Sequence, residues 1–317
     1  MKILITGGFG LLGARLAEHL LLHRHQITLA SRSEKQISKN LLGARFFKIN
    51  WGDISSLQEM VQDHDIIIHA AGVNSINSVE DPVEAKIVNA DVTSQLAKVA
   101  KNSGVSKFIL LSTIHVYSNK LSGIINEDSV TSNPHPYASS NLLGEKAILE
   151  LNSSIGLEGI VFRLSNNFGY PAFPNNDCWS LVINDFCLQA ITKNEIVING
   201  SGEDVRDFIP ISIFCDIFDN VLSDPRIFSN DQKIYNICSS NSISILEVAQ
   251  EIQSLCKKEF GFEPLIKKNQ SSLKNSISKF KIDSCMEDLS KFDFDMRFKD
   301  ELLTLLQFCK LNKEHLN

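Results

Sequence analysis

A glycine-rich turn near the N-terminus carries the residues whose types and spacing most clearly suggest chemistry. The segment from Thr6 to Gly13 reads TGGFGLLG. Gly7 permits a tight turn, Gly10 leaves room for a pyrophosphate, and Gly13 lets a following helix pack closely on the preceding strand. The helix N-terminus offers N–H groups and a positive dipole end to phosphate. Gly7, Gly10, Leu11 and Gly13 are therefore predicted to bind a dinucleotide; a purely structural turn is the alternative.

Such a turn must be positioned by a strand before it and a helix after it. Apolar runs indicate strands at residues 2–6, 26–30, 46–50, 65–71 and 108–112, and helical spacing indicates helices at 11–23 and 82–103. This rhythm predicts parallel strands joined by right-handed crossovers, with both faces of the sheet covered. The predicted fold class is α/β: a Rossmann-type doubly wound parallel sheet with a smaller C-terminal substrate-binding region.

The pattern changes after about residue 165. A segment rich in Asn, Pro and Gly is followed by an expected helix at 179–192, a strand at 195–199, an amphipathic stretch at 245–257 and a loop at 267–281. We predict a dinucleotide-binding domain over residues 1–165, with a later strand near 233–237 returning to its sheet. Residues 166–317 are expected to form mainly the substrate-binding region.

Composition excludes several classes of partner. The net charge is -6 and the basic residues form no block, so neither nucleic acid nor a membrane surface is expected to bind. No apolar run reaches the roughly 18 residues of a membrane span. The first strand begins at Lys2, so no signal peptide is expected. The seven cysteines are scattered without a CxxC motif, which predicts reduced thiols, no metal site and a cytoplasmic protein.

Two further segments, Gly52-Asp53-Ile54 and His69-Ala70-Ala71-Gly72, accompany the turn, whose spacing is T-G-x-x-G-x-x-G. Together they resemble the extended short-chain dehydrogenase/reductase superfamily, in particular its NAD(P)-dependent nucleotide-sugar epimerase/dehydratase branch. The resemblance covers roughly residues 1–250 and is weak over the rest. It implies that Asp53 and Ile54 flank the adenine, that Ala70 and Ala71 line the cofactor cleft, and that Asn89 begins the long helix beside the active site.

The resemblance also implies a catalytic trio of Ser or Thr, Tyr, and a Lys four residues after the Tyr. Thr113 falls at the hydroxyl position, and Tyr137 falls at the proton-transfer position, where it also contacts the cofactor. The lysine position holds Asn141. Asparagine can hydrogen-bond the ribose but carries no charge, whereas a nearby cation lowers a pKa by ~1–3 units. The pKa of Tyr137 is therefore expected to stay close to the ordinary ~10.

Two later segments concern the substrate. Asn166 lies in RLSNNFG, which resembles the family's R-x-x-N-x-x-G stretch, and this resemblance implies contact with a nucleotide sugar. Arg206 lies in GSGEDVRDF, which resembles G-x-G-x-x-x-R-D-[FY], and its implied role is to bind the substrate diphosphate. A guanidinium suits that role because its fork matches phosphate oxygens. The alternative for Arg206 is a surface salt bridge.

The end of the second strand bears on cofactor choice. NAD-preferring relatives place an acid there to bond the ribose 2′-hydroxyl, whereas this strand ends LASRS. Ser31 and Arg32 are instead predicted to receive a 2′-phosphate. NADP is therefore favoured and NAD remains possible; the alternative for Arg32 is an exposed side chain without a function.

Two classes of function remain. The favoured one is an NAD(P)-dependent enzyme acting on a nucleotide-activated sugar, above all a keto-sugar reductase, with epimerisation still possible. The alternative is a catalytically weak or inactive dinucleotide-binding sensor or scaffold that lacks the active-site lysine. The resemblance further implies a homodimer formed by helices within 84–103 and 137–153. These segments carry the apolar residues Ile87, Val88, Val92, Leu96, Leu142, Leu143 and Ile148.

Overall fold

The computed structural model describes residues 1–33, 37–152, 156–269 and 280–316. Within them the chain forms two compact units. The first unit comprises Met1–Asn119, Glu127–Leu164 and Phe218–Asn236, and the second comprises Lys120–Asn126, Ser165–Ile217 and Ile237–Asn317.

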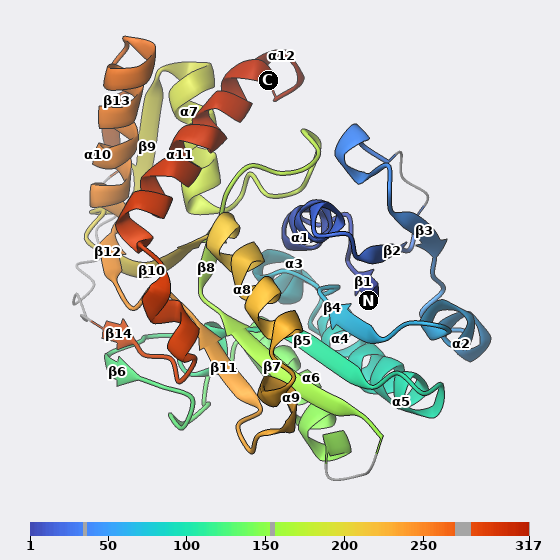
Figure 1. Ribbon diagram of the computed structural model, residues 1–317. Helices are drawn as coiled ribbons and strands as arrows, with labels where there is room; N and C mark the ends of the chain where they lie inside the picture. The colour runs from blue at the N-terminus through green and yellow to red at the C-terminus, as the bar shows by residue number, and fades with distance from the viewer. Residues whose placement is uncertain (34–36, 153–155, 270–279, 317) are drawn as a thin grey trace. The chain divides into compact units, whose positions relative to one another are not determined.

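A seven-stranded sheet organises the first unit (Figure 1). Its order is β11 (Ile234–Ile237), β7 (Glu158–Leu164), β5 (Lys107–Thr113), β4 (Ile66–His69), β1 (Lys2–Thr6), β2 (Gln26–Ser31) and β3 (Arg45–Lys48). The pairings from β3 through β7 are parallel. This confirms the predicted Rossmann-type α/β fold. The chain order reverses between β1 and β4, and such a reversal opens a ligand crevice at the carboxyl ends of the strands.

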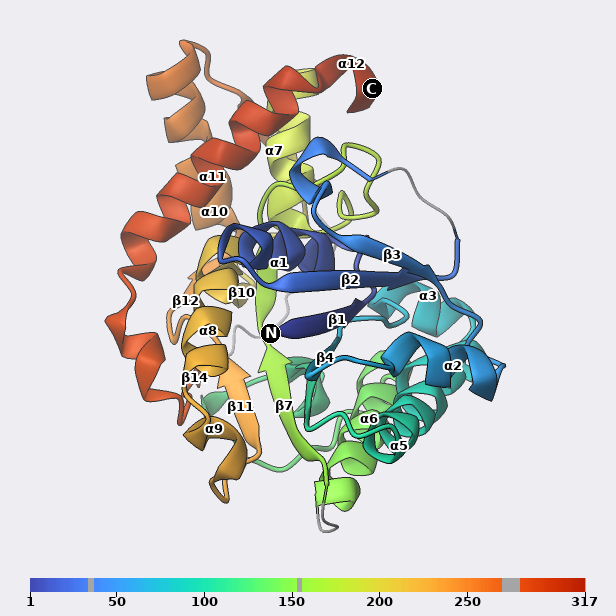
Figure 2. The same cartoon turned by 45° about the vertical axis from the view of Figure 1, so that its right-hand side comes forward.

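Helices cover both faces of this sheet (Figures 1 and 2). One face carries α1 (Leu11–Leu22) and, from residue 218 onward, α8 (Ile211–Ser223); the other carries α2 (Ile54–Val61), α5 (Thr93–Asn102) and α6 (Pro136–Asn152). Leu4 and Phe108 pack among the residues of this second layer, while their neighbours Ile3 and Ile109 are equally buried. Because both faces of the central strands are covered, their residues form continuous apolar runs.

The predicted helix at 82–103 is interrupted in its hydrogen-bonding pattern. It consists of α4 (Pro82–Lys86), a π-helical segment at Ile87–Val92, and α5. The Asp81 carboxylate caps α4 by accepting the N–H groups of Val83 and Glu84. Asn89 therefore lies inside the π segment and does not begin the helix, which corrects the position expected for it. Single π turns of this kind occur frequently at functional sites.

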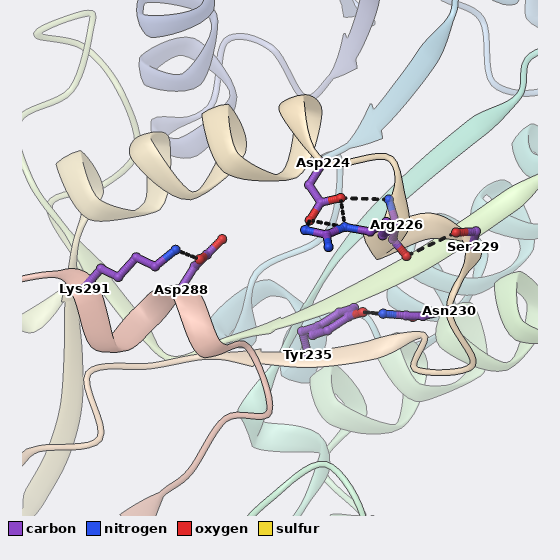
Figure 3. A network of polar contacts seen from close by, with 7 residues as sticks. All are labelled: Asp224, Arg226, Ser229, Asn230, Tyr235, Asp288 and Lys291. Carbon is purple, nitrogen blue, oxygen red and sulfur yellow. Dashed lines mark hydrogen bonds and ion pairs between the residues drawn. The ribbon is translucent and has the colours of Figure 1, made fainter.

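A short charged turn connects α8 to α9 (Arg226–Ser229) in the first unit (Figure 3). The Arg226 guanidinium donates through Nε and Nη2 to the Asp224 carboxylate at 2.8 and 2.7 Å. This partner lowers the pKa of Asp224 to about 2. Nearby, the amide of Asn230 donates to the Tyr235 hydroxyl at 3.1 Å. These contacts are local, and they fix the turn that precedes β11.

The second unit is built from short sheets and three longer helices. Its strands form the sheet β12 (Ser242–Ser244), β10 (Val205–Pro210), β8 (Asn166–Phe168), and the pairs β9 (Glu195–Asn199) with β13 (Leu265–Asn269) and β6 (Gly123–Ile125) with β14 (Phe280–Ile282). The helices are α7 (Val182–Lys193), α10 (Ile245–Leu255) and α11 (Phe294–Leu311), with the short α12 (Lys313–Leu316) at the end. The loop expected at 267–281 is wrong at both of its ends, which lie in β13 and β14; the residues between 269 and 280 lie outside the described part.

A core of its own holds the second unit together. Phe168, Phe186, Leu302 and Leu305 belong to one buried cluster formed by β8, α7 and α11. Burial in this cluster raises the pKa of Cys309 to about 12, so that thiol stays protonated. Among the helices that the structure describes, none combines the length and the apolar character needed to cross a membrane.

Candidate active site

The glycine-rich turn joins β1 to α1 at the point where the strand order reverses. Gly7 adopts a positive φ of 66°, and a Cβ on it would lie 2.6 Å from the backbone of Ala70. A Cβ on Gly13 would lie 2.5 Å from the carbonyl oxygen of Gly7. Side chains at either position would therefore collide with backbone, which holds the turn, α1 and the segment after β4 in close contact.

The first turn of α1 fits an anionic ligand. Gly10 is its N-cap residue, no side chain caps the helix, and no acidic residue lies in its first turn, which begins at Leu11. The N–H groups at such a helix end need acceptors, and the helix dipole favours negative charge there. The residues present thus fit the pyrophosphate of a dinucleotide.

Ser31 and Arg32 lie at the end of β2, next to this turn in the sheet. The Arg32 side chain is mostly exposed, and its Nη1 lies 3.6 Å from Oε1 of Glu84. An exposed pair at that distance is weak. Arg32 is thus available to another anion, although Glu84 is a competing partner.

Asp53 and Ile54 begin α2. The Asp53 carboxylate accepts the N–H and the hydroxyl of Ser55 at 2.9 and 2.6 Å, so it caps this helix. The Ser55 hydroxyl bond holds the pKa of Asp53 below its usual range. The side chain of Ile54 is exposed. The capping role accounts for an aspartate at this position without any ligand.

Ala70 and Ala71 follow β4, and a buried histidine fixes the strand end before them. His69 Nδ1 lies 2.6 Å from the Thr6 hydroxyl and Nε2 lies 3.0 Å from the Thr93 hydroxyl. Burial lowers the pKa of His69 to about 4, so its ring is neutral near pH 7. This histidine links β1, β4 and α5, a positioning role that sequence reasoning did not assign to it.

Asn89 ties three elements together. Its Oδ1 accepts the N–H of Val73 at 2.7 Å, and its Nδ2 donates to the Ser140 hydroxyl on α6 at 3.0 Å. The side chain is buried. These bonds fix the segment after β4 against α6, which carries Tyr137.

The structure brings Thr113 and Tyr137 together. Thr113 is the last residue of β5, Tyr137 is the second residue of α6, and the Thr113 hydroxyl is near enough to the phenol to affect its pKa. Burial raises the pKa of Tyr137 above its ordinary value, and the neighbouring Thr113 hydroxyl opposes only part of that effect. Tyr137 is therefore a neutral phenol at neutral pH, able to donate a proton.

Asn141 lies one helical turn after Tyr137 on the same face of α6. Its Nδ2 donates to the backbone carbonyl of Tyr137 at 2.8 Å. The amide thus bonds the helix itself and places no charge beside the phenol. The exposed Lys146, farther along α6, lies on another face of the helix.

A buried ionic network joins β7 to β5 and α6, the two elements that carry Thr113 and Tyr137. Arg163 on β7 donates through Nη2 to Oε2 of Glu145 at 2.7 Å, and the Ser112 hydroxyl donates to the other carboxylate oxygen. The Arg163 guanidinium also lies 4.8 Å from the centroid of the Tyr117 ring. The Tyr117 hydroxyl is itself engaged, donating to Oδ1 of Asn236 at 2.7 Å. Sequence analysis did not identify Glu145, because nothing in its local sequence indicates a buried partner.

Asn166 and Arg206 lie in the second unit, on the paired strands β8 and β10. Asn166 Nδ2 donates to the backbone carbonyl of Asp207 at 2.8 Å. Arg206 is exposed, and its Nη1 donates to the carbonyl of Val205 at 2.8 Å. Among the described residues, Arg206 forms no salt bridge with an acid.

Asp207 points to the opposite side of β10 from Arg206, as successive strand residues do. It is buried and accepts the N–H and the hydroxyl of Ser239 at 3.0 and 2.8 Å. Burial raises the pKa of Asp207 to about 6. By anchoring β10, Asp207 fixes the strand that presents Arg206 to solvent. One sequence feature pointed to this role of Asp207, namely its position directly after Arg206.

Comparison with known proteins identifies the family. The model of the "NAD dependent epimerase/dehydratase family" matches residues 3–238. A dTDP-D-glucose 4,6-dehydratase of Dictyostelium discoideum is 27% identical over 274 residues, which cover 79% of this chain and 61% of that protein. The chain thus spans less than two thirds of that relative. A UDP-N-acetyl-alpha-D-glucosaminuronate decarboxylase of Bacillus cytotoxicus is 30% identical over 268 residues, 80% of each chain.

The fold is shared with solved structures of the same kind. A UDP-glucuronic acid 4-epimerase from Bacillus cereus in complex with NAD aligns with a TM-score of 0.79 at 22% identity, covering 98% of this chain and 96% of that one. The matched family model covers well over half of the chain and includes both the glycine-rich turn and the Thr113–Tyr137 pair. The chain therefore belongs to the NAD dependent epimerase/dehydratase family.

Proposed function

We propose that this protein is an NAD(P)-dependent oxidoreductase of nucleotide-activated sugars that works as a keto-sugar reductase. The observation that carries the proposal is the placement of Tyr137 beside the Thr113 hydroxyl at the end of β5, where burial keeps the phenol protonated. Membership of the family and the nucleotide-sugar enzymes among its relatives support the substrate class.

The proposed chemistry assigns one task to each side chain. A bound reduced nicotinamide supplies a hydride for the carbonyl carbon of the sugar. Thr113 holds the carbonyl oxygen by a hydrogen bond, and Tyr137 gives that oxygen its proton. A neutral phenol suits proton donation better than proton removal, so reduction is favoured over oxidation.

The test is turnover with defined substrates. Purified protein is mixed with NADPH or NADH and a panel of UDP- and dTDP-linked keto-sugars, and loss of the reduced cofactor is followed by absorbance. The same protein is incubated with NAD⁺ or NADP⁺ and the corresponding hydroxy-sugars. We expect turnover in the reductive direction; turnover in neither direction would favour a sensor or scaffold.

Cofactor preference gives a separate prediction. We propose that Ser31 and Arg32 bind the 2′-phosphate of NADP(H), although the Bacillus cereus relative was solved with NAD. Replacing Arg32 with alanine should weaken NADPH binding about tenfold, since a charged hydrogen bond contributes roughly 1.5–3 kcal/mol. NADH binding should not change, and it serves as the internal control. Calorimetry that finds NADH bound as tightly as NADPH in the wild type would refute the preference.

Diphosphate binding by Arg206 gives another prediction. Its exposed guanidinium lies on β10, and Asp207 fixes the strand behind it. Replacing Arg206 with alanine should weaken UDP-sugar binding about tenfold or more. Arg206→Lys should lose part of the affinity, because it keeps the charge but not the fork. If calorimetry shows NADPH binding falling equally in the alanine variant, Arg206 supports the fold and does not hold the substrate.

We further propose a homodimer formed by the α4–α6 region. Val92, Leu96 and Ile148 are buried within the chain, so we leave them out of the proposed interface. Val88 and Leu142 are half-buried, and Ile87 and Leu143 are the most exposed of the set, at 48% and 43%. Light scattering at micromolar concentration should give the mass of a dimer, and the double variant Ile87→Asp/Leu143→Asp should give that of a monomer. A monomeric wild type would contradict the proposal.

A further inference from the structure

Two histidines and an aspartate meet in the first unit on the face of the sheet opposite to α6. His19 and His23 lie four residues apart at the C-terminal end of α1, and Asp219 lies on α8. His19 Nε2 lies 2.8 Å from Oδ2 of Asp219, and His23 Nδ1 lies 3.0 Å from Oδ1. The three ligand atoms lie within 4.8 Å of one another. One carboxylate group thus contacts both imidazole rings, one through each of its oxygens.

The cluster is open to solvent but partly enclosed. The exposed fractions of the His19, His23 and Asp219 side chains are 19%, 47% and 34%. The two imidazole rings are 4.5 Å apart between centroids and stand at 75° to each other. His25 follows on the same segment, and its buried Nδ1 has no hydrogen-bond partner. Because the three side chains are partly exposed, a small ion could reach the cluster and still bind water on its exposed side.

We propose that His19, His23 and Asp219 form a binding site for a divalent transition metal, with Zn²⁺ as the ion that fits best. Two imidazole nitrogens, one carboxylate oxygen and one water complete the tetrahedral set that zinc favours. Bond lengths near 2.0–2.1 Å place tetrahedral ligand atoms about 3.3 Å apart. The present contacts of 2.8 and 3.0 Å are made by different oxygens of the Asp219 carboxylate, and the three ligand atoms lie within 4.8 Å, so small side-chain rotations would have to bring them to that spacing around an ion.

The role of this site is structural. α1 follows the carboxyl end of β1 and runs back antiparallel to the strands. Its C-terminal end therefore lies near the amino ends of the strands, away from the glycine-rich turn. A metal there would join α1 to α8 and would lie away from the Thr113–Tyr137 pair. Binding only to the folded protein, it would raise the stability of the first unit. Sequence analysis expected no metal site because it found no clustered ligand spacing, and a site that joins His19 to Asp219, 200 residues away, leaves no such local pattern.

Zinc titration of a tag-free, chelator-treated protein tests the proposal. The titration is done in a Cys285→Ser background, because the exposed thiol of Cys285 can also bind zinc. Calorimetry should find one zinc per chain, with affinity at least tenfold lower in His19→Ala and in His23→Ala and absent in the double variant. His315→Ala removes an exposed histidine of the second unit and should bind like the parent. Zinc should raise the thermal midpoint of the parent but not that of the double variant.

Cobalt supplies the second measurement. Co²⁺ bound by nitrogen and oxygen ligands should give a visible absorption spectrum without the thiolate charge-transfer band. If His19→Ala does not fold, His23→Ala still decides the matter, because the His23 side chain is nearly half exposed and its loss should be tolerated. Zinc affinity unchanged in the His23 variant, or no binding by the parent at micromolar zinc, would overturn the proposal.

Discussion

Replacing Tyr137 with phenylalanine is expected to lower the rate of keto-sugar reduction by about 10²–10⁴-fold, the usual contribution of a positioned acid. The change removes a single oxygen, which lies near the Thr113 hydroxyl at the carboxyl end of β5. The ring remains, so the fold and cofactor binding should persist. The loss should therefore fall on kcat, with little change in the Kd of NADPH.

Tyr117→Phe is the matched control for this experiment. Tyr117 is a second phenol near the end of β5, but its hydroxyl donates to Asn236 and is buried. We expect this variant to keep most of its activity if it folds. Steady-state kinetics on both variants decide the assignment. Full activity in Tyr137→Phe together with loss of activity in Tyr117→Phe would show that Tyr117, and not Tyr137, is the proton donor.

Replacing Glu145 with glutamine is expected to lower the free energy of unfolding of the first unit by about 3–5 kcal/mol. The exposed fractions of the Glu145 and Arg163 side chains are 1% and 4%, and their contact is 2.7 Å long. The glutamine leaves the guanidinium buried without a counter-charge. Ser112 also loses the charged acceptor of its hydroxyl. The effect should thus exceed that of any surface substitution.

Urea unfolding followed by fluorescence measures this effect. The chain has two tryptophans, Trp51 in the first unit and Trp179 in the second, so a Trp179→Phe background reports on the first unit alone. Glu150→Gln, an exposed change on the same helix, should stay within about 0.5 kcal/mol of the parent. A double change, Glu145→Gln with Arg163→Met, should recover part of the loss because it removes the unpaired charge. A loss for Glu145→Gln as small as that of the control would contradict the network.

The sequence predicted the parallel sheet well because its central strands are buried on both faces. Such strands appear as short apolar runs, as in β1 and β4, and their bounds agree to within a residue or two. β7 was not predicted as a strand. Its run EGIVFRL contains a charged residue, Arg163, at a buried position, and the counter-charge that pairs with it is the distant Glu145. A partner on another element cannot be inferred from local pattern.

In the candidate site too, features set by local sequence were predicted and features set by distant partners were not. The glycine-rich turn is local, so its spacing alone predicted its shape, and the positive φ of Gly7 agrees with that prediction. Thr113 and Tyr137 are separated by 24 positions, and a family resemblance was needed to pair them. The π segment around Asn89 was not foreseeable, because apolar spacing does not distinguish π from α hydrogen bonding. The anchoring role of Asp207 was missed because its partner Ser239 lies far along the chain, after β11.

The most direct test of the central claim is the pH dependence of reduction in the wild type and in Asn141→Lys. The claim is that Tyr137 donates a proton from its neutral state, because burial raises its pKa and no cation among the described residues contributes to that pKa. Reduction by the wild type should therefore stay constant through neutral pH and fall only where the phenol ionises, above pH ~10. A lysine at position 141 should lower the pKa of Tyr137 by ~1–2 units, shift that fall to lower pH, and accelerate the reverse oxidation at neutral pH by up to about a hundredfold. The claim would be contradicted if the wild type and Asn141→Lys gave the same pH profile of reduction and Tyr137→Phe gave that profile too.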